Sequence, residues 1–335
     1  MENDKIDALA KIARITGFRE IPKATQVKLA IVDDGWLSVV KNADFALNDQ
    51  IIYCRVGSIL PDHPEYAFLK GSHLKTKKFL GIISQGLILP VKHIHLFNPN
   101  FDLTSITDGM NVTELMHIEK HVPKEEVEIS SGSKWIENLP KTDEPRLQGM
   151  KKSLREFSGN FIITKKADGS SFTVGFYEGR LRLLSRNFEL FERSGHIHYY
   201  DIANKYKFSD VVTEEGFFFQ GELIGPKVNG NRQKLTEFKW LVFNVYDIKN
   251  GRYLIWDDMV EKCNKCGFET VEIVHRGELF GEADYRNIAY LVELANSQTY
   301  STGFPCEGIV MKSDYYGNDF HGKIISPEYE VKYGL

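Results

Sequence analysis

The stretch FIITKKADGSS, residues 161–171, is a short apolar run that ends in two lysines, an aspartate and a glycine. This pattern is typical of a strand that delivers a reactive side chain into a tight turn. A lysine amine becomes a nucleophile only where burial, a neighbouring cation or a metal disfavours its charge. Lys166 is the candidate nucleophile, and Asp168 is close enough in sequence to orient the amine or to bind a metal. Such a turn is also common on solvated surfaces, so it needs support from the rest of the chain.

Four further stretches supply that support, and they follow in a fixed order: SRN at 185–187, GELIGP at 221–226, FNVYDI at 243–248 and EGIVMK at 307–312. Together with residues 166–170 they resemble the motifs of the covalent nucleotidyltransferases, which comprise ATP-dependent RNA and DNA ligases and mRNA capping enzymes. The resemblance implies that Lys166 takes a nucleoside monophosphate as a phosphoramide. Five ordered matches are far more specific than the lysine turn alone.

Length and composition limit the class of protein. A chain of 335 residues with 42% hydrophobic content suggests two packed domains. The formal net charge of −4 excludes a generally basic nucleic-acid binder, so any RNA site must be a local patch. Four scattered cysteines suit reduced thiols, and we expect Cys263 and Cys266 to be buried thiols rather than zinc ligands. No signal peptide or long apolar span is recognisable, which predicts a soluble cytoplasmic protein, and nothing requires more than a monomer.

The first part of the chain predicts a small β-rich domain. A helix is expected at 4–15, followed by short strands at 27–32, 36–40, 50–56 and 78–84 between turn signals. So many short strands suggest a compact barrel, and an oligonucleotide-binding (OB) fold is the best match. Lys75, Lys77 and Lys78 beside Phe79 would suit a nucleic-acid face, or else a solvated edge strand. The region 75–89 also resembles the N-terminal OB module of the RNA ligase branch typified by the Naegleria and Deinococcus enzymes.

The polar segment at 98–141, with one expected helix at 112–121, is predicted to be a linker. The predicted domains are therefore an OB-fold domain with linker at 1–140 and a nucleotidyltransferase domain at 141–335. In the second domain, amphipathic helices are expected at 257–265 and 282–296, covering a sheet. The resulting fold class is α+β, an OB-fold β-barrel followed by an antiparallel-sheet nucleotidyltransferase domain.

Several residues are candidates for binding the nucleotide. In the resembling branch a basic residue at the position of Arg146 reaches the triphosphate. Arg186 follows a predicted strand, where a guanidinium could bind a phosphate or an RNA 5′ end, although an ordinary surface arginine would look the same. Glu222 lies in a strongly strand-like run, where a buried carboxylate is costly unless it is paired, and the resemblance gives it the ribose hydroxyls. The resemblance places Tyr246 on the purine ring, with Phe243 as the second candidate.

The catalytic candidates beyond Lys166 are charged residues near strand ends. Glu307 could hold a metal through water, because magnesium prefers oxygen ligands and keeps several waters. The resemblance implies that Asp168 and Glu307 hold Mg²⁺ or Mn²⁺, and that Lys312 and Lys323 bind phosphates. Two departures from the family pattern stand out. His321 occupies the place of the first of two usual lysines, and Lys165 stands where many ligases have a glutamate.

Together, the motifs and the resemblance predict an ATP-dependent RNA ligase that seals a 3′-hydroxyl to a 5′-phosphate, with a role in RNA repair. ATP would adenylate Lys166, adenylate would move to the RNA 5′-phosphate, and the 3′-hydroxyl would displace AMP. The branch resemblance favours nicks in duplexes, with RNA or an RNA/DNA hybrid as partner. The alternatives are a capping guanylyltransferase, a DNA ligase, or an RNA-binding OB protein without activity.

Overall fold

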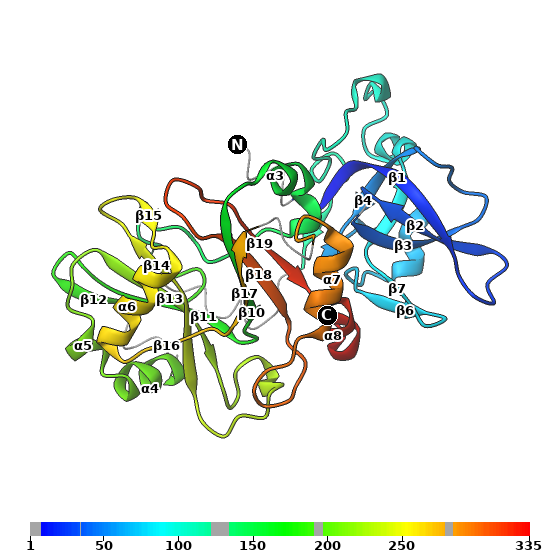
Figure 1. Cartoon of the computed structure of the whole chain (residues 1–335). Coiled ribbons are helices and arrows are strands. Elements are labelled where there is room, and N and C mark those ends of the chain that lie inside the picture. Colours follow the sequence, from blue (N-terminus) through cyan, green and yellow to red (C-terminus); the bar gives the residue numbers. More distant parts are fainter. Residues whose placement is uncertain (1–7, 34, 122–133, 191–196, 279–283) are drawn as a thin grey trace.

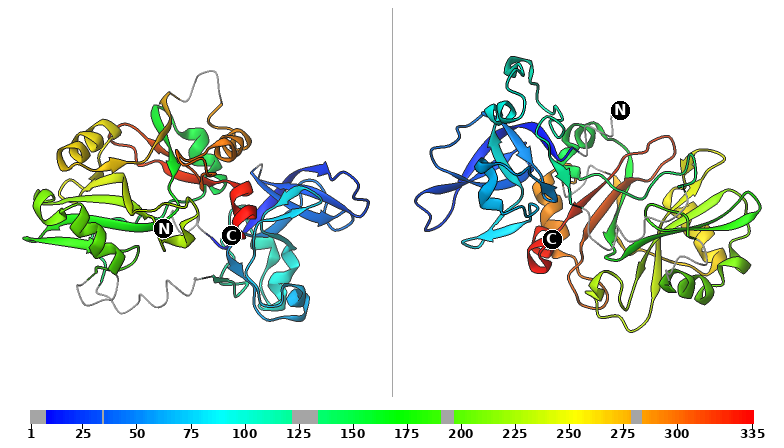
Figure 2. Two further views of the ribbon diagram at one scale, coloured as in Figure 1. Left: turned by 90° about the horizontal axis from the view of Figure 1, so that it is seen from below. Right: turned by 180° about the vertical axis from the view of Figure 1, so that it is seen from behind.

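The computed structural model describes residues 8–33, 35–121, 134–190, 197–278 and 284–335 (Figure 1). Two lobes lie side by side, and the last helix of the chain, α8 (Pro327–Tyr333), lies between them (Figures 1 and 2). The N-terminal lobe is built on a five-stranded antiparallel sheet in the order β3-β2-β1-β4-β8. Its strands are β1 (Ala10–Glu20), β2 (Val27–Val32), β3 (Trp36–Lys41), β4 (Gln50–Cys54) and β8 (Leu87–Pro90). The sheet curls, and the Gln85 amide donates to the Leu37 carbonyl at 2.6 Å, which brings the β8 side towards β3.

The helix expected at 4–15 is wrong for the described part of that range. Residues 4–7 lie outside the described residues, and from Ala10 onward the chain is strand β1, paired with both β2 and β4. Ala10 and Ile12 face one apolar core, whereas Ala13 and Ile15 face another. A strand buried on both faces produces apolar residues at spacings that resemble a helix, because neither face is polar.

Two other N-terminal predictions also need correction. The strand expected at 78–84 is a hairpin of β6 (Lys77–Phe79) and β7 (Ile82–Ser84), because Leu80 and Gly81 both take positive φ and reverse the chain. The helix expected at 112–121 is a set of turns that ends in β9 (Glu119–Lys120), which pairs with β5 (Ser58–Ile59). Its Thr113 hydroxyl accepts from the backbone of the chain entering β1, at 3.1 Å from the Ala10 amide. The remaining short helices of this lobe are η1 (Pro64–Leu69), η2 (Val91–Leu96) and η3 (Leu103–Ser105).

The second lobe contains two sheets whose neighbouring strands are antiparallel, apart from one short parallel pair of β14 with β16. The smaller sheet has the order β17-β10-β18-β19, and the larger has the order β12-β11-β13-β14-β15 with β16 beside β14. The strands are β10 (Asn160–Lys166), β11 (Ser170–Tyr177), β12 (Arg180–Leu184), β13 (Phe217–Ile224), β14 (Lys239–Asp247), β15 (Arg252–Tyr253), β16 (Glu269–Thr270), β17 (Ile273–Glu278), β18 (Gly308–Ser313) and β19 (His321–Ile325).

Helices cover the outer faces of both sheets. The larger sheet packs around buried Trp240 and Phe208 beneath α4 (Ile197–Lys205), α5 (Phe208–Val211) and α6 (Trp256–Cys266). The smaller sheet packs through Phe161 and Leu291 against η4 (Leu147–Gly149), α3 (Lys151–Glu156) and α7 (Ile288–Ser297). The expectations at 257–265 and 282–296 correspond to α6 and α7, although residues 282–283 lie outside the described residues and α7 begins only at Ile288. Cys263 of α6 is buried in this core, as expected, whereas Cys266 at the end of the helix is only half-buried.

The predicted boundary at residue 140 falls just after a gap in the described chain. Leu139 packs with Phe218 and Tyr246, so the segment before the boundary rests on the second lobe. A division into 1–140 and 141–335 stays a prediction. Within the part of the chain that the structure describes, no helix is long and apolar enough to cross a membrane.

Candidate active site

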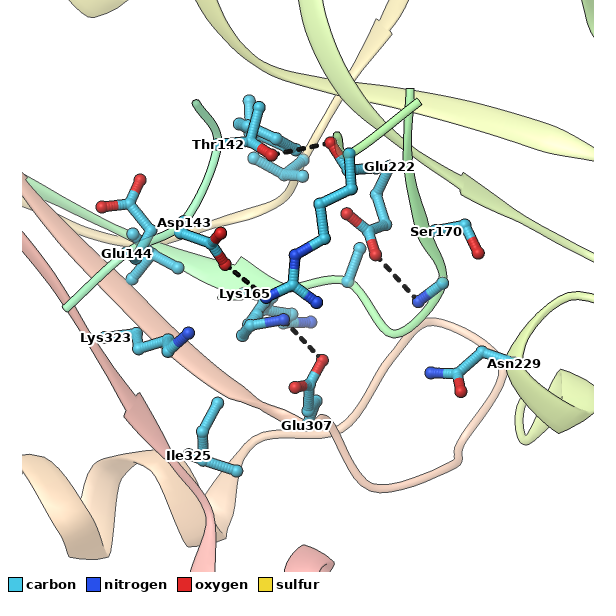
Figure 3. A pocket seen from close by; sticks show the side chains of 18 of the residues that line it. Thr142, Asp143, Glu144, Lys165, Ser170, Glu222, Asn229, Glu307, Lys323 and Ile325 are labelled. Carbon is cyan, nitrogen blue, oxygen red and sulfur yellow. Dashed lines mark hydrogen bonds and ion pairs between the residues drawn. The ribbon is translucent and has the colours of Figure 1, made fainter. Parts of the chain in front are cut away.

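The two sheets of the second lobe meet at the lysine turn. Lys166 is the last residue of β10 and pairs with Gly308 at the start of β18, and β11 begins at Ser170. Glycine is needed at this meeting point, since a Cβ on Gly308 would lie 2.0 Å from the Ile324 carbonyl oxygen and one on Gly169 2.1 Å from that of Leu223. The turn opens into a cavity of about 590 Å³ that both sheets line. Figure 3 shows Glu222, Glu307 and Lys323 reaching into it from different elements.

Lys166 is paired with a carboxylate. Its Nζ donates to Glu307 Oε2 at 2.7 Å, and both side chains are largely buried. Burial acts to lower the pKa of Lys166, but Glu307, Glu222 and Asp168 outweigh it and raise the pKa above its usual value. The amine is therefore an ammonium in this state, and it becomes a nucleophile only when the surrounding negative charge is reduced.

Glu222 lies in the middle of β13, as the sequence suggested, and faces the same cavity. Its Oε1 accepts a hydrogen bond from the Gly169 amide at 3.1 Å. Burial raises the pKa of Glu222 to about 7, with Glu307 and Asp168 adding to the rise and Lys166 opposing it. Because this pKa lies near neutral pH, a cation or a hydroxyl donor that binds beside Glu222 would shift the carboxyl towards its ionised form.

Both carboxylate oxygens of Asp168 accept hydrogen bonds from other side chains. Oδ1 accepts from Asn229 and from Arg232 at 2.8 Å, and Oδ2 accepts from the Tyr329 hydroxyl. Burial, followed by repulsion from Glu307, raises the pKa of this carboxyl. Asp168 is not among the residues that line the cavity. Its contacts indicate that it fixes the lysine turn to two other parts of the chain.

Four cationic side chains line the cavity. Arg146, Arg186, Lys312 and Lys323 all line it, from separate segments. Burial lowers the pKa of Lys323 to about 8, with Lys166 and Arg146 acting in the same direction. Such mutual repulsion among buried cations favours the binding of an anion.

Acidic residues that the sequence analysis did not single out pair with several of these cations. Arg186 contacts Asp143, and Lys312 lies 3.4 Å from Glu144. Glu144 also contacts Nδ1 of His321. Although burial opposes it, Lys312 and His321 lower the pKa of Glu144 to about 2. His321 therefore points at a carboxylate rather than directly into the cavity.

The two aromatic candidates for the purine lie in different surroundings. Phe243 lines the cavity beside Val271, whereas Tyr246 does not. Tyr246 lies further along β14, where Leu139 covers it and Tyr253 packs against its ring at 5.0 Å between centroids. Phe243 is also the extra residue of a β-bulge, since Gln220 pairs with Asn244 and Gly221 with Val242. Of the two candidates, Phe243 is therefore the one whose side chain lines the cavity.

Other residues of the site carried no recognisable signal in the sequence. Tyr300 donates to the Lys166 carbonyl at 2.6 Å and accepts from the Glu307 amide at 3.1 Å, which fixes Lys166 relative to Glu307. Tyr329 and Glu330 reach the site from the last helix, α8 (Pro327–Tyr333). These residues come from loops and a helix with no short motif, so only the folded chain identifies them.

Comparison with known proteins supports what the geometry indicates. An RNA ligase family model matches residues 159–325, and an OB-fold domain model matches residues 9–91. Three solved structures of Naegleria gruberi RNA ligase are similar at 26% identity. A ligand-free variant covers 98% of both chains with a TM-score of 0.84, and a variant with ATP and manganese covers 98% of this chain and 100% of that one, also at 0.84. A variant with AMP and manganese covers 96% and 97%, at 0.81. No curated protein sequence matched.

A strand-end lysine that faces carboxylates and buried cations between two antiparallel sheets is the arrangement expected of a covalent nucleotidyltransferase. The N-terminal sheet is an OB-fold half-barrel, so the α+β fold predicted from the sequence is confirmed. The chain belongs to the RNA ligase family.

Proposed function

We propose that this RNA ligase uses ATP to join a 3′-hydroxyl to a 5′-phosphate, with nicks in duplex RNA as its substrate. The observation that carries the proposal is the position of Lys166, whose amine lies against Glu307 at 2.7 Å inside a cavity that Arg146, Lys312 and Lys323 also line. The structures of the Naegleria gruberi enzyme with ATP and manganese, with AMP and manganese, and with pyrophosphate support it.

In the first step the Nζ–P bond to Lys166 forms on the α-phosphorus of ATP, and the bond from that phosphorus to pyrophosphate breaks. The amine must first give up its proton, because the ammonium has no lone pair. Arg146, Lys312 and Lys323 would bind the phosphates and stabilise the charge that develops on the leaving group. Phe243 offers an aromatic face to the base.

The acidic side chains around the amine suit a hard divalent cation such as Mg²⁺ or Mn²⁺. No cluster of three ligating side chains that could hold a metal occurs among residues 8–33, 35–121, 134–190, 197–278 and 284–335. Glu307, with Glu222 beside it, would therefore hold the ion together with water and phosphate oxygens, which is the usual habit of magnesium. Asp168 fits this role poorly, because its oxygens are already occupied. The ion would supply positive charge that offsets the carboxylates and lowers the pKa of Lys166.

In the second step an oxygen of the RNA 5′-phosphate forms a bond to the adenylate phosphorus, and the Nζ–P bond to Lys166 breaks. In the third, the RNA 3′-hydroxyl forms a bond to the 5′-phosphate phosphorus, loses its proton, and AMP leaves. Arg186 at the rim of the cavity is the residue that we assign to the 5′-phosphate, which would displace its contact with Asp143. The protein would act as a monomer.

The experiment compares substrates for a single enzyme preparation. Wild-type protein is given ATP or GTP, Mg²⁺ or Mn²⁺, and a 5′-phosphate nick in duplex RNA, the same nick in DNA, or single-stranded RNA. Sealing of the RNA nick with ATP, faster than the other two substrates, is the expected result. Preference for the DNA nick would assign the protein to DNA repair, and use of GTP without sealing would assign it to capping.

A further inference from the structure

The lysines that the sequence marked as a possible nucleic-acid face have another role in the folded chain. Lys78 pairs with Glu328 of α8 at 2.6 Å, and Lys75 donates to the Gly334 carbonyl at 2.7 Å. The Thr76 amide donates to the carbonyl of Leu335. The base of the β6–β7 hairpin therefore docks the OB domain onto the C-terminal helix (Figures 1 and 2).

Glu330 is the buried centre of this contact. Its side chain is only 3% exposed, and its two oxygens are divided between the domains. Oε1 accepts from Arg146 Nη2 at 2.7 Å, in the nucleotidyltransferase domain. Oε2 accepts from the Thr76 hydroxyl at 2.6 Å and from Gln85 Nε2 at 3.4 Å, both in the OB domain. A buried carboxylate is retained only where such partners compensate its lost hydration.

Arg146 is held through its backbone and through one nitrogen of its guanidinium. Its backbone pairs with β19 next to Lys323, and the Lys323 amide donates to the Pro145 carbonyl at 2.8 Å. Nη2 is fixed by Glu330, whereas the buried Nη1 has no hydrogen-bond partner within the described chain. Because Arg146 and Lys323 line the same cavity, a phosphate bound there would lie near both cations.

The same turn of α8 also reaches the nucleophile's turn. Tyr329, the neighbour of Glu330, donates its hydroxyl to Asp168, two residues after Lys166. Ser326 caps the start of the helix by accepting from the Tyr329 amide at 3.1 Å. The helix thus fixes two parts of the site, the lysine turn and the arginine, to one docking element.

We propose that Glu330 is a positioning residue for nucleotide transfer: it orients Arg146 towards the triphosphate and makes that orientation depend on the docked OB domain. This inference rests on the proposed function. It predicts that Glu330 matters for transfer of AMP from ATP to Lys166 and does not matter for sealing an RNA end that already carries AMP, because that end brings no pyrophosphate.

The test compares Glu330→Gln, Arg146→Ala, the double variant and a matched control, Glu328→Gln. Glu328 lies on the same helix and also contacts the OB domain, but its pair with Lys78 is exposed and does not include Arg146. Two rates are measured for each protein: single-turnover labelling of Lys166 over a range of ATP concentrations, and sealing of a nicked RNA duplex with a pre-adenylated 5′ end. If the wild-type protein is not labelled, the proposed function itself fails, independently of the role of Glu330.

We expect Glu330→Gln to slow labelling by roughly 10- to 100-fold at low ATP, the usual effect of misplacing a charged positioning group. Sealing of pre-adenylated RNA should stay within about twofold, as should both rates of Glu328→Gln. The double variant should label no more slowly than Arg146→Ala, because the glutamate acts through the arginine. Normal labelling by Glu330→Gln, an equal loss of both rates, or multiplied effects in the double variant would overturn the proposal.

A second variant approaches the same link from the other domain. Thr76→Val keeps the shape of the side chain but removes the hydroxyl that Glu330 Oε2 accepts from. It should slow labelling of Lys166 by about threefold without affecting the sealing of pre-adenylated RNA. This variant also keeps the proposal testable if Glu330→Gln does not fold. Unchanged labelling by Thr76→Val would show that Arg146 does not depend on the OB domain.

Discussion

Lys323 gives ATP binding a pH dependence that follows directly from its surroundings. Burial, with help from Lys166 and Arg146, lowers its pKa to about 8. The charged fraction of the amine therefore falls from about 90% at pH 7 to about 10% at pH 9. The positive charge of Lys323, and with it the attraction for phosphate, is present below pH 8 and is lost as the pH rises through that value. A charged hydrogen bond contributes about 1.5–3 kcal/mol, so ATP affinity should fall about five- to tenfold over this interval.

The assay is calorimetric titration with an ATP analogue whose α,β-bridging oxygen is a methylene, so that Lys166 stays intact but cannot react. Lys323→Arg is the matched control, because a guanidinium keeps its charge throughout this range. The control also retains Glu222, whose pKa of about 7 lies in the same interval. The five- to tenfold fall that Lys323 causes should be missing from the arginine variant, whereas any contribution of Glu222 remains in both proteins. A flat wild-type profile, or the same slope in both proteins, would refute the reasoning.

The remaining predictions concern base recognition and the packing of the site. Phe243→Ala should weaken ATP binding by roughly tenfold, the usual loss of one stacked aromatic ring, whereas Tyr246→Phe should leave it unchanged; equal effects in a titration would contradict the placement of the two rings. Gly308→Ala should lower the melting temperature by several degrees, because its Cβ would meet the Ile324 carbonyl oxygen at 2.0 Å. An unchanged thermal unfolding curve would show that β18 and β19 can separate at little cost.

The residues that sequence could predict lie at the ends of short, regular strands. Lys166 and Glu307 both follow or precede apolar runs, and the antiparallel pairing of β10 with β18 brings them together without any irregularity. Glu222 was recognisable because a carboxylate inside a buried strand must have a partner. In each case the local pattern and the position in the fold agree.

What sequence could not predict depends on irregular or distant contacts. The bulge at Phe243 has no signature in the chain, and it changes which aromatic ring faces the cavity. Strand β1 was read as a helix because two cores share it. Glu330 and Tyr329 act on residues more than a hundred positions earlier, through a helix whose sequence looks like any surface helix. Such contacts arise only when the whole chain has folded.

The most direct test of the central claim is to find where the nucleotide attaches. The protein is incubated with Mg²⁺ or Mn²⁺ and ATP labelled at the α-phosphate, digested, and the labelled peptide is identified by mass spectrometry. The account predicts AMP on Lys166, no label in Lys166→Ala, and a retained label in the neighbouring control Lys165→Ala. Label on Lys165 or on another residue, or label that survives in Lys166→Ala, would contradict it.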